Sequence, residues 1–211
     1  MKSLNQYIIE KILINKSSKF INKIKVESKD QLQLIIQERY NKNNSFIDLT
    51  DIDISELNNL WGIFGKLNTV EVVDISGWDT SNVITMDCMF SQCIKLKNII
   101  GIENLDVSKS EDVSYMFYGD ENLVELDLTN WNPKLLQKTH YMFYGCSNLK
   151  FIKNIENWQL PNIKDVSYMF YYCAKLDVDL SNWDYTNIKK SFKIGIVGNS
   201  HITKNHYPKL N

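Results

Sequence analysis

The sequence lacks any uninterrupted apolar segment of the roughly 18 or more residues that a membrane span requires. Its start, Met1 to Tyr7, does not resemble a signal peptide. Glu10, Lys11 and Asn15 interrupt the apolar residues, and no small-residue cleavage site follows. We therefore expect a cytoplasmic protein without a membrane partner, although surface exposure by another route stays open.

Residues typical of catalytic sites are scarce. Histidine occurs only as His140, His201 and His206, and no His or Cys spacing matches a metal site. The sequence holds no nucleophile elbow and no glycine-rich phosphate loop, since the segment Gly195–Gly198 is too short and no predicted helix follows it. We predict that the protein is not an enzyme and uses neither a metal nor another cofactor.

The net charge is only −1, but the charged residues are unevenly distributed along the chain. Residues 1–43 hold nine Lys/Arg and four Asp/Glu, residues 44–180 hold ten and twenty, and residues 181–211 hold five and one. An acidic middle suits a basic protein surface, whereas it opposes the phosphates of a nucleic acid. We therefore expect a protein partner and no direct binding of nucleic acid.

A repeat dominates the sequence from about residue 50 onward. Four Met-Phe pairs and a preceding Ile-Phe pair place Phe at spacings of 26, 27, 26 and 27 residues. These residues are Phe64, Phe90, Phe117, Phe143 and Phe170. A bulky apolar residue stands twelve positions before each of the last four: Trp78, Leu105, Trp131 and Trp158. The period falls within the 20–29 residues of leucine-rich repeats, whose units must stack to bury their apolar faces.

The repeat predicts an α/β solenoid over residues 44–190, with about five units that each contribute a short parallel strand and a short helix. The helices are expected where apolar residues follow an i, i+3, i+7 pattern, as Val83, Met86 and Phe90 do. The strands are expected near residues 96–99, 123–128, 149–152 and 176–180.

The two ends of the chain lack the repeat and are predicted to cap the solenoid. Residues 1–43 predict one helix over Leu4–Leu13 and a second that begins after Ser28, with Gln31 completing a capping box, and runs to about Tyr40. Residues 191–211 predict a closing strand over Phe192–Val197 and a frayed tail. Glycine stands at position 195, where the next repeat Phe is expected.

Cysteine is rare and follows the repeat. Cys93, Cys146 and Cys173 stand three residues after a repeat Phe, at a position that Asp120 holds in the remaining unit. This recurrence favours small, buried, reduced thiols. A Cys146–Cys173 disulfide stays open, because neighbouring units of such a stack lie only about 4.7–4.9 Å apart.

Several strings resemble the BspA-like leucine-rich repeats of bacterial surface proteins. They are Ser76-Gly77-Trp78-Asp79-Thr80-Ser81-Asn82-Val83, Met89-Phe90-Ser91-Gln92-Cys93, Asp112-Val113-Ser114-Tyr115-Met116-Phe117 and Asp165-Val166-Ser167-Tyr168-Met169-Phe170. The resemblance covers about residues 50–190 and implies a curved solenoid with a binding or adhesive role. Family members are often secreted or lipid-anchored, which the start of this sequence does not match.

Tyrosine recurs at two positions of the repeat. The first tyrosine series, two residues before the repeat Phe, is Tyr115, Tyr141 and Tyr168, and the second, one residue after it, is Tyr118, Tyr144 and Tyr171. On a helix both series would point away from the core in adjacent columns. Two interpretations stay open: the rings stack and shield the coils from water, or they bind a partner.

Acidic residues concentrate in one unit and complete the predicted partner-binding set: Glu111, Asp112, Asp120, Glu121, Glu125 and Asp127. They form either a solvated face or a patch that docks on a basic protein. We predict a protein–protein interaction module. The first alternative is an intracellular inhibitor, encoded by a phage or mobile element, that blocks a nucleic-acid-processing complex such as a CRISPR-type defence complex. A bacterial surface adhesin is the second.

Overall fold

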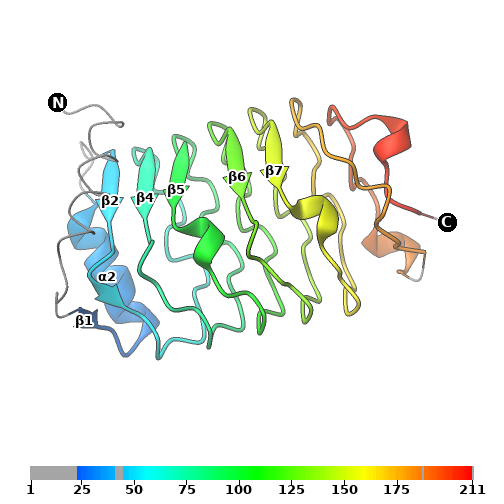
Figure 1. Cartoon of the computed structure of the whole chain (residues 1–211). Coiled ribbons are helices and arrows are strands. Elements are labelled where there is room, and N and C mark those ends of the chain that lie inside the picture. The colour runs from blue at the N-terminus through cyan, green and yellow to red at the C-terminus, as the bar shows by residue number, and fades with distance from the viewer. Residues whose placement is uncertain (1–22, 41–44, 187, 211) are drawn as a thin grey trace.

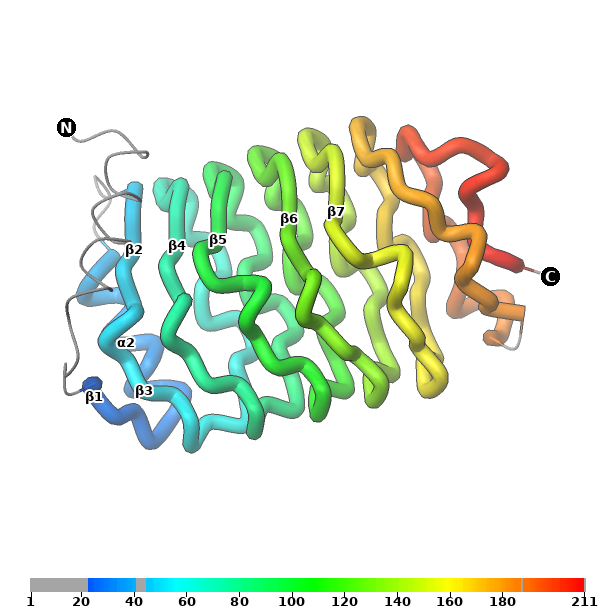
Figure 2. Tube along the Cα trace, viewed as in Figure 1, coloured from blue at the N-terminus to red at the C-terminus, as the bar shows by residue number. Residues whose placement is uncertain are grey.

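The computed structural model describes residues 23–40, 45–186 and 188–210, which form a stack of similar coils (Figure 1). Successive coils run in parallel, as the trace in Figure 2 shows. Residues pair at an offset equal to the sequence period, so Val72 pairs with Asn98. Isolated bridges link Thr85, Asp112 and Lys138 in the same way. Residues one repeat apart in the sequence are therefore neighbours in space.

Short strands line one side of the stack, and all of them pair in parallel. One sheet contains β2 (Phe46–Asp48), β4 (Val72–Asp74) and β5 (Asn98–Ile100), and another contains β6 (Glu125–Asp127) and β7 (Phe151–Lys153). The 3-10 helices η1 (Ile102–Asn104) and η2 (Ile155–Asn157) follow β5 and β7. The strand predicted near residues 176–180 is wrong, because Leu180 donates its N–H to the carbonyl of His206 instead of continuing the sheet.

The segments predicted as short helices are series of tight turns, so this prediction is wrong. Tyr115 and Phe117 donate their N–H groups to carbonyls 25 residues further on, in the next coil, and Met116 donates to the carbonyl three residues back. An α-helix instead requires bonds to the carbonyl four residues back. The turns nevertheless bury the same apolar residues, so the i, i+3, i+7 spacing fits both conformations.

A column of stacked phenylalanines forms the centre of the stack. It consists of Phe64, Phe90, Phe117, Phe143 and Phe170, all fully buried. Neighbouring ring centroids lie 4.9, 5.7, 5.4 and 5.4 Å apart, and the ring planes differ by at most 6°. Full burial of one such side chain stabilises the fold by roughly 1.5–3 kcal/mol. The spatial proximity predicted for the repeat phenylalanines is confirmed.

Helix α2 (Lys29–Arg39) covers the N-terminal end of the stack (Figure 1) and matches the second helix predicted for the cap. The Ser28 hydroxyl accepts a hydrogen bond from the N–H of Gln31 at 3.2 Å. The Gln31 side chain accepts from the N–H of Glu27, so the reciprocal bond lies one residue earlier than in a standard capping box. The helix predicted over Leu4–Leu13 lies outside the described residues. The elements at this end are β1 (Ile24–Lys25), α2 (Lys29–Arg39) and β3 (Ile52–Asp53).

The C-terminal segment continues the repeat, and the closing strand predicted over Phe192–Val197 is wrong. The C-terminal segment contains η3 (Lys190–Phe192) and then a series of turns. The carbonyl groups of these turns accept hydrogen bonds from N–H groups of the preceding coil. The buried Val197 stands at the position of the repeat Phe. This is two residues later than position 195, where the repeat predicted it. The tail also packs against the stack, through η4 (Lys204–His206) and a bond from the N–H of Tyr185 to the carbonyl of Lys209.

Candidate interaction surface

The first tyrosine series lies at a position where the backbone is left-handed. The φ angles of Tyr115, Tyr141 and Tyr168 are 57°, 57° and 55°, and the equivalent Gly62 and Gly195 have 62° and 64°. A side chain costs roughly 1–2 kcal/mol in this conformation, a cost that glycine avoids. Strained positions of this kind cluster at functional sites. Cys88 occupies the same position at φ 56°. The left-handed turn therefore belongs to the repeat, and three successive coils fill it with tyrosine.

The two tyrosine series stack into adjacent columns, as predicted. Neighbouring rings of the first series lie 5.0 and 4.9 Å apart, and those of the second lie 5.1 and 5.8 Å apart. Within each coil the two tyrosines are 5.4 to 5.6 Å apart at a steep angle. All six side chains are half-buried. We call this array of six rings the tyrosine patch.

The tyrosine patch is three coils wide because both columns end on small residues. In the coil after the last tyrosine pair, a Cβ atom at Gly195 would lie 2.6 Å from the Tyr168 ring, and one at Gly198 would lie 2.3 Å from the Tyr171 ring. Only glycine fits at these two positions without displacing a ring. In the coil before the first tyrosine pair, the equivalent positions hold Cys88 and Ser91.

Three phenol groups of the patch have a raised pKa. Burial raises the pKa of Tyr115, Tyr141 and Tyr144 above its ordinary value near 10. These three residues thus present neutral hydroxyl groups, which can donate or accept hydrogen bonds.

The acidic residues do not form one patch. Asp112 lies beside the tyrosine patch and pairs with Lys138 at 3.1 Å, and the neighbouring Glu111 accepts a hydrogen bond from Gln137 at 2.9 Å. Glu121 is exposed at the outer corner of its coil. Glu125 and Asp127 belong instead to β6, on the strand side.

Asp120 is wrong as a partner-binding residue, because it is fully buried. It takes the position of the core cysteines, and one carboxyl oxygen accepts the N–H of Cys93 at 2.9 Å. Its other oxygen has no hydrogen-bond partner among the described residues. Burial raises the pKa of Asp120 well above its usual range, which favours the neutral acid in the core.

The cysteines at this position are free thiols, as predicted. Cys93, Cys146 and Cys173 are buried, and each Sγ lies 3.0 Å from a phenylalanine carbonyl oxygen of an earlier coil. Burial raises the pKa of all three thiols. They are therefore unreactive core groups.

A Ser–His–Asp cluster borders the patch, but its geometry is not that of a nucleophilic triad. The Oγ of Ser114 lies 2.8 Å from Nδ1 of His140, and the same nitrogen lies 3.9 Å from Asp165. A triad uses the two ring nitrogens for the two partners. Ser114 is also buried, at 1% exposure, which leaves its hydroxyl out of reach of a substrate.

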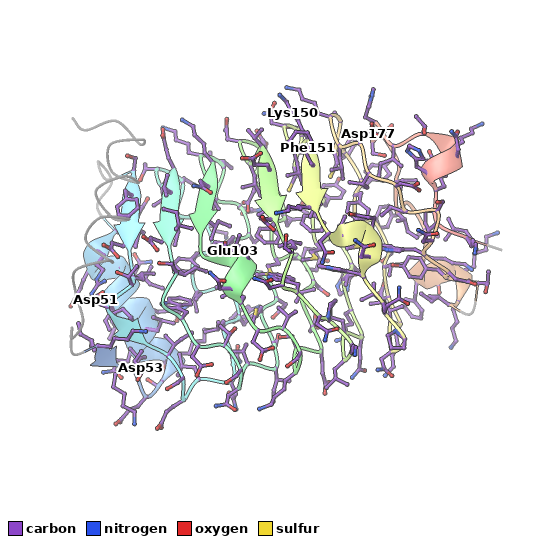
Figure 3. All side chains as sticks on the ribbon, in the orientation of Figure 1. Asp51, Asp53, Glu103, Lys150, Phe151 and Asp177 are labelled. Atoms are coloured by element: carbon purple, nitrogen blue, oxygen red, sulfur yellow. The ribbon has the colours of Figure 1, made fainter. Side chains whose placement is uncertain are left out.

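The strand side has a hollow of about 450 Å³ over β5, β6 and β7. Phe151, which lines this hollow and is labelled in Figure 3, is 55% exposed. Ion pairs join neighbouring coils on this side, Lys153–Asp127 at 2.7 Å and Lys97–Glu71 at 2.9 Å. The hollow is also lined by Glu103 and the exposed Glu125, so the strand side is the alternative candidate surface.

Over the residues that the structure describes, no helix is both long and apolar enough for a transmembrane span. In the same residues, no three His, Cys, Asp or Glu side chains are grouped so that they could hold a metal ion.

Parallel coils of constant period and a row of outward tyrosines define a repeat protein with a surface array of side chains. The chain belongs to the family described as Mycoplasma protein of unknown function, DUF285, whose model matches residues 31–150 and 97–203. The two matches overlap, as an internally repeated sequence allows. No curated protein and no solved structure matches the chain.

Sequence reasoning missed several residues that shape this surface. The bounding glycines, Gly195 and Gly198, align with the tyrosine series only when the last unit is given a period of 27 residues. Tyr172, the third tyrosine of its coil, is 47% exposed and contacts Tyr144 edge-on at 5.5 Å. Its place in the run Tyr171-Tyr172 was the available indication.

Proposed function

We propose that the chain is a non-catalytic protein–protein interaction module, a solenoid of leucine-rich-repeat type that holds a partner on its tyrosine patch. The observation that carries this proposal is the presence of tyrosine at three left-handed positions where the end coils have glycine. Tyrosine supplies a large contact area at modest entropic cost and is enriched among residues that dominate binding energy. The strain at these positions is consistent with selection for binding.

Electrostatics beside the patch favour a partner with basic side chains. Asp87 is half-buried, and burial, together with the charge of Asp112, raises its pKa. Among the described residues no basic side chain forms an ion pair with Asp87. The charge of Lys138, which pairs with Asp112, also acts on Asp87. A Lys or Arg of the partner would add positive charge beside these two carboxyl groups, and such pairs fix both association rate and orientation.

The proposal is tested by replacing Tyr115, Tyr141 and Tyr168 together with glycine. Glycine relieves about 1–2 kcal/mol of backbone strain per position, which offsets the loss of stacking of about 0.5–1.5 kcal/mol per ring pair. The variant should therefore fold. Partners recovered by the wild-type protein from its native cells are then measured against the variant by calorimetry.

The expected result is a loss of affinity of about a hundredfold or more, equivalent to about 2.7 kcal/mol. The matched control is Phe151→Ser on the strand side, which should leave affinity unchanged. Full affinity of the triple variant, with loss in the control, would refute the assignment to this face. A nucleic-acid-processing partner would indicate the inhibitor role, and a host surface protein the adhesin role.

A further inference from the structure

A groove of about 600 Å³ runs along the stack beside the second tyrosine series. Its lining extends from Asn68 in an early coil to Tyr172 three coils beyond Gln92. Its lining includes Gly119 and Gly145 together with Tyr118 and Tyr144. The groove therefore shares two tyrosines with the tyrosine patch and adds other positions of the repeat.

The groove exists because glycine occupies two neighbouring positions of one column of the repeat. Gln92, Gly119, Gly145 and Tyr172 are equivalent, and all are left-handed, with φ of 61°, 71°, 75° and 62°. A Cβ atom at Gly119 would meet only the Gln92 side chain, at 3.8 Å, and one at Gly145 would meet only the Gly119 backbone, at 3.7 Å or more. Packing does not demand glycine here. The two glycines open the hollow between the side chains of Gln92 and Tyr172.

The dimensions match a short extended peptide. Gln92 and Tyr172 are three coil steps apart, which corresponds to roughly 14 Å at about 4.8 Å per step. An extended chain advances about 3.3–3.4 Å per residue, so about four residues span this distance.

The chemistry of the lining selects for a basic peptide. Glu121, which is exposed, is the one charged residue among those that line the groove. Three tyrosine rings also line the groove: Tyr172 packs edge-on against Tyr144 at 5.5 Å, and Tyr144 stacks on Tyr118 at 5.1 Å. A carboxylate and tyrosine rings in one groove suit an ammonium or guanidinium group. The amides of Asn68 and Gln92 can bond a peptide backbone.

We propose that this groove binds an extended, lysine- or arginine-containing segment of the partner, about four residues long, with one basic side chain paired to Glu121. The inference rests on the proposed function and specifies which part of the partner the surface reads. The tyrosine patch supplies the broad contact, and the groove supplies the sequence preference.

The test uses the full chain and a fluorescein-labelled hexapeptide in which lysine alternates with serine, followed by fluorescence anisotropy. A peptide with glutamate in place of lysine is the probe control. The groove is filled by Gly145→Asn and, separately, by Gly119→Asn. Asparagine is suitable because Asn199 occupies the equivalent position of the last coil at φ 54°. The matched control is Gly62→Asn, at a left-handed glycine with nothing within 4 Å of its Cβ position and outside the groove.

Saturable binding of the lysine peptide is expected for the wild-type protein and for Gly62→Asn. Filling the groove should weaken it about tenfold or more, and Glu121→Gln should weaken it about threefold or more. No saturable binding of the lysine peptide, equal binding of the glutamate peptide, or unchanged binding by both filled variants would overturn the proposal. If the tyrosine triple variant loses partner binding but both groove-filling variants keep it, the groove proposal alone is overturned. Partner binding indifferent to the tyrosines would refute the proposed function instead.

Discussion

Asp120 should make the protein less stable as the pH rises, and Asp120→Asn should remove this dependence. The Asp120 carboxyl is buried at the position where three other coils have cysteine, and its pKa in the folded state is raised. In the unfolded chain an aspartate titrates near pH 3.9. Above that pH the unfolded state releases a proton that the folded state retains, so the free energy of unfolding falls with increasing pH.

The slope for one retained proton is about 1.4 kcal/mol per pH unit between the unfolded and folded pKa values. Asparagine has nearly the same shape, stays neutral, and can still accept the N–H of Cys93, which lies 2.9 Å from the Asp120 oxygen. Between roughly pH 4.5 and 5.5 the wild-type protein should therefore lose about 1.4 kcal/mol relative to Asp120→Asn.

Urea unfolding followed by tryptophan fluorescence at a series of pH values measures the difference between the two proteins. Asp120→Cys, which restores the residue of the other coils, is a second variant and should behave like Asp120→Asn. Parallel pH profiles for the wild-type and variant proteins would show that the carboxyl is ionised or solvated in the folded state. A wild-type protein that gains stability relative to the variants would contradict the sign of the effect.

Three further predictions concern stability and are measured by urea unfolding. Arg39→Lys should cost about 1 kcal/mol, because lysine cannot reproduce the two bonds of 2.6 and 3.0 Å from Arg39 to Asp51; equal stability would mean that this contact does not hold helix α2. Phe117→Ala should cost about 3–5 kcal/mol and the exposed Phe151→Ala less than about 0.5 kcal/mol, and similar costs would disprove the stacked core. Gly198→Ala should cost about 1–3 kcal/mol, because its Cβ would lie 2.3 Å from the Tyr171 ring. Gly65→Ala at the equivalent position meets nothing closer than 3.4 Å and is its control; equal costs would contradict this packing.

Much of the core could be predicted from the sequence, because a constant period places equivalent residues together whatever the local conformation. The phenylalanine spacing predicted the central column, and Ser28 with Gln31 predicted the start of α2. The turns were mistaken for helices because an i, i+3, i+7 apolar pattern is also satisfied by turns. The left-handed backbone at Tyr115 could not be foreseen, since tyrosine rarely adopts it.

The candidate surface was predicted less completely than the core. The tyrosine columns followed from the repeat, but burial of Asp120 did not, because aspartate usually lies at the surface. The sequence period predicted the repeat Phe position at Gly195. In the structure Val197 fills that position, and Gly195 ends the first tyrosine series. The groove at Gly119 and Gly145 follows from the absence of side chains, which becomes visible only when the coils are aligned in space.

Site-specific photo-cross-linking tests the central claim most directly. The photoreactive residue p-benzoylphenylalanine is placed at Tyr141, in the middle of the tyrosine patch, or at Phe151 on the strand side, and the protein is irradiated in its native cells. The account predicts a discrete cross-linked partner from position 141 and none from position 151. Cross-links from position 151 alone would contradict it.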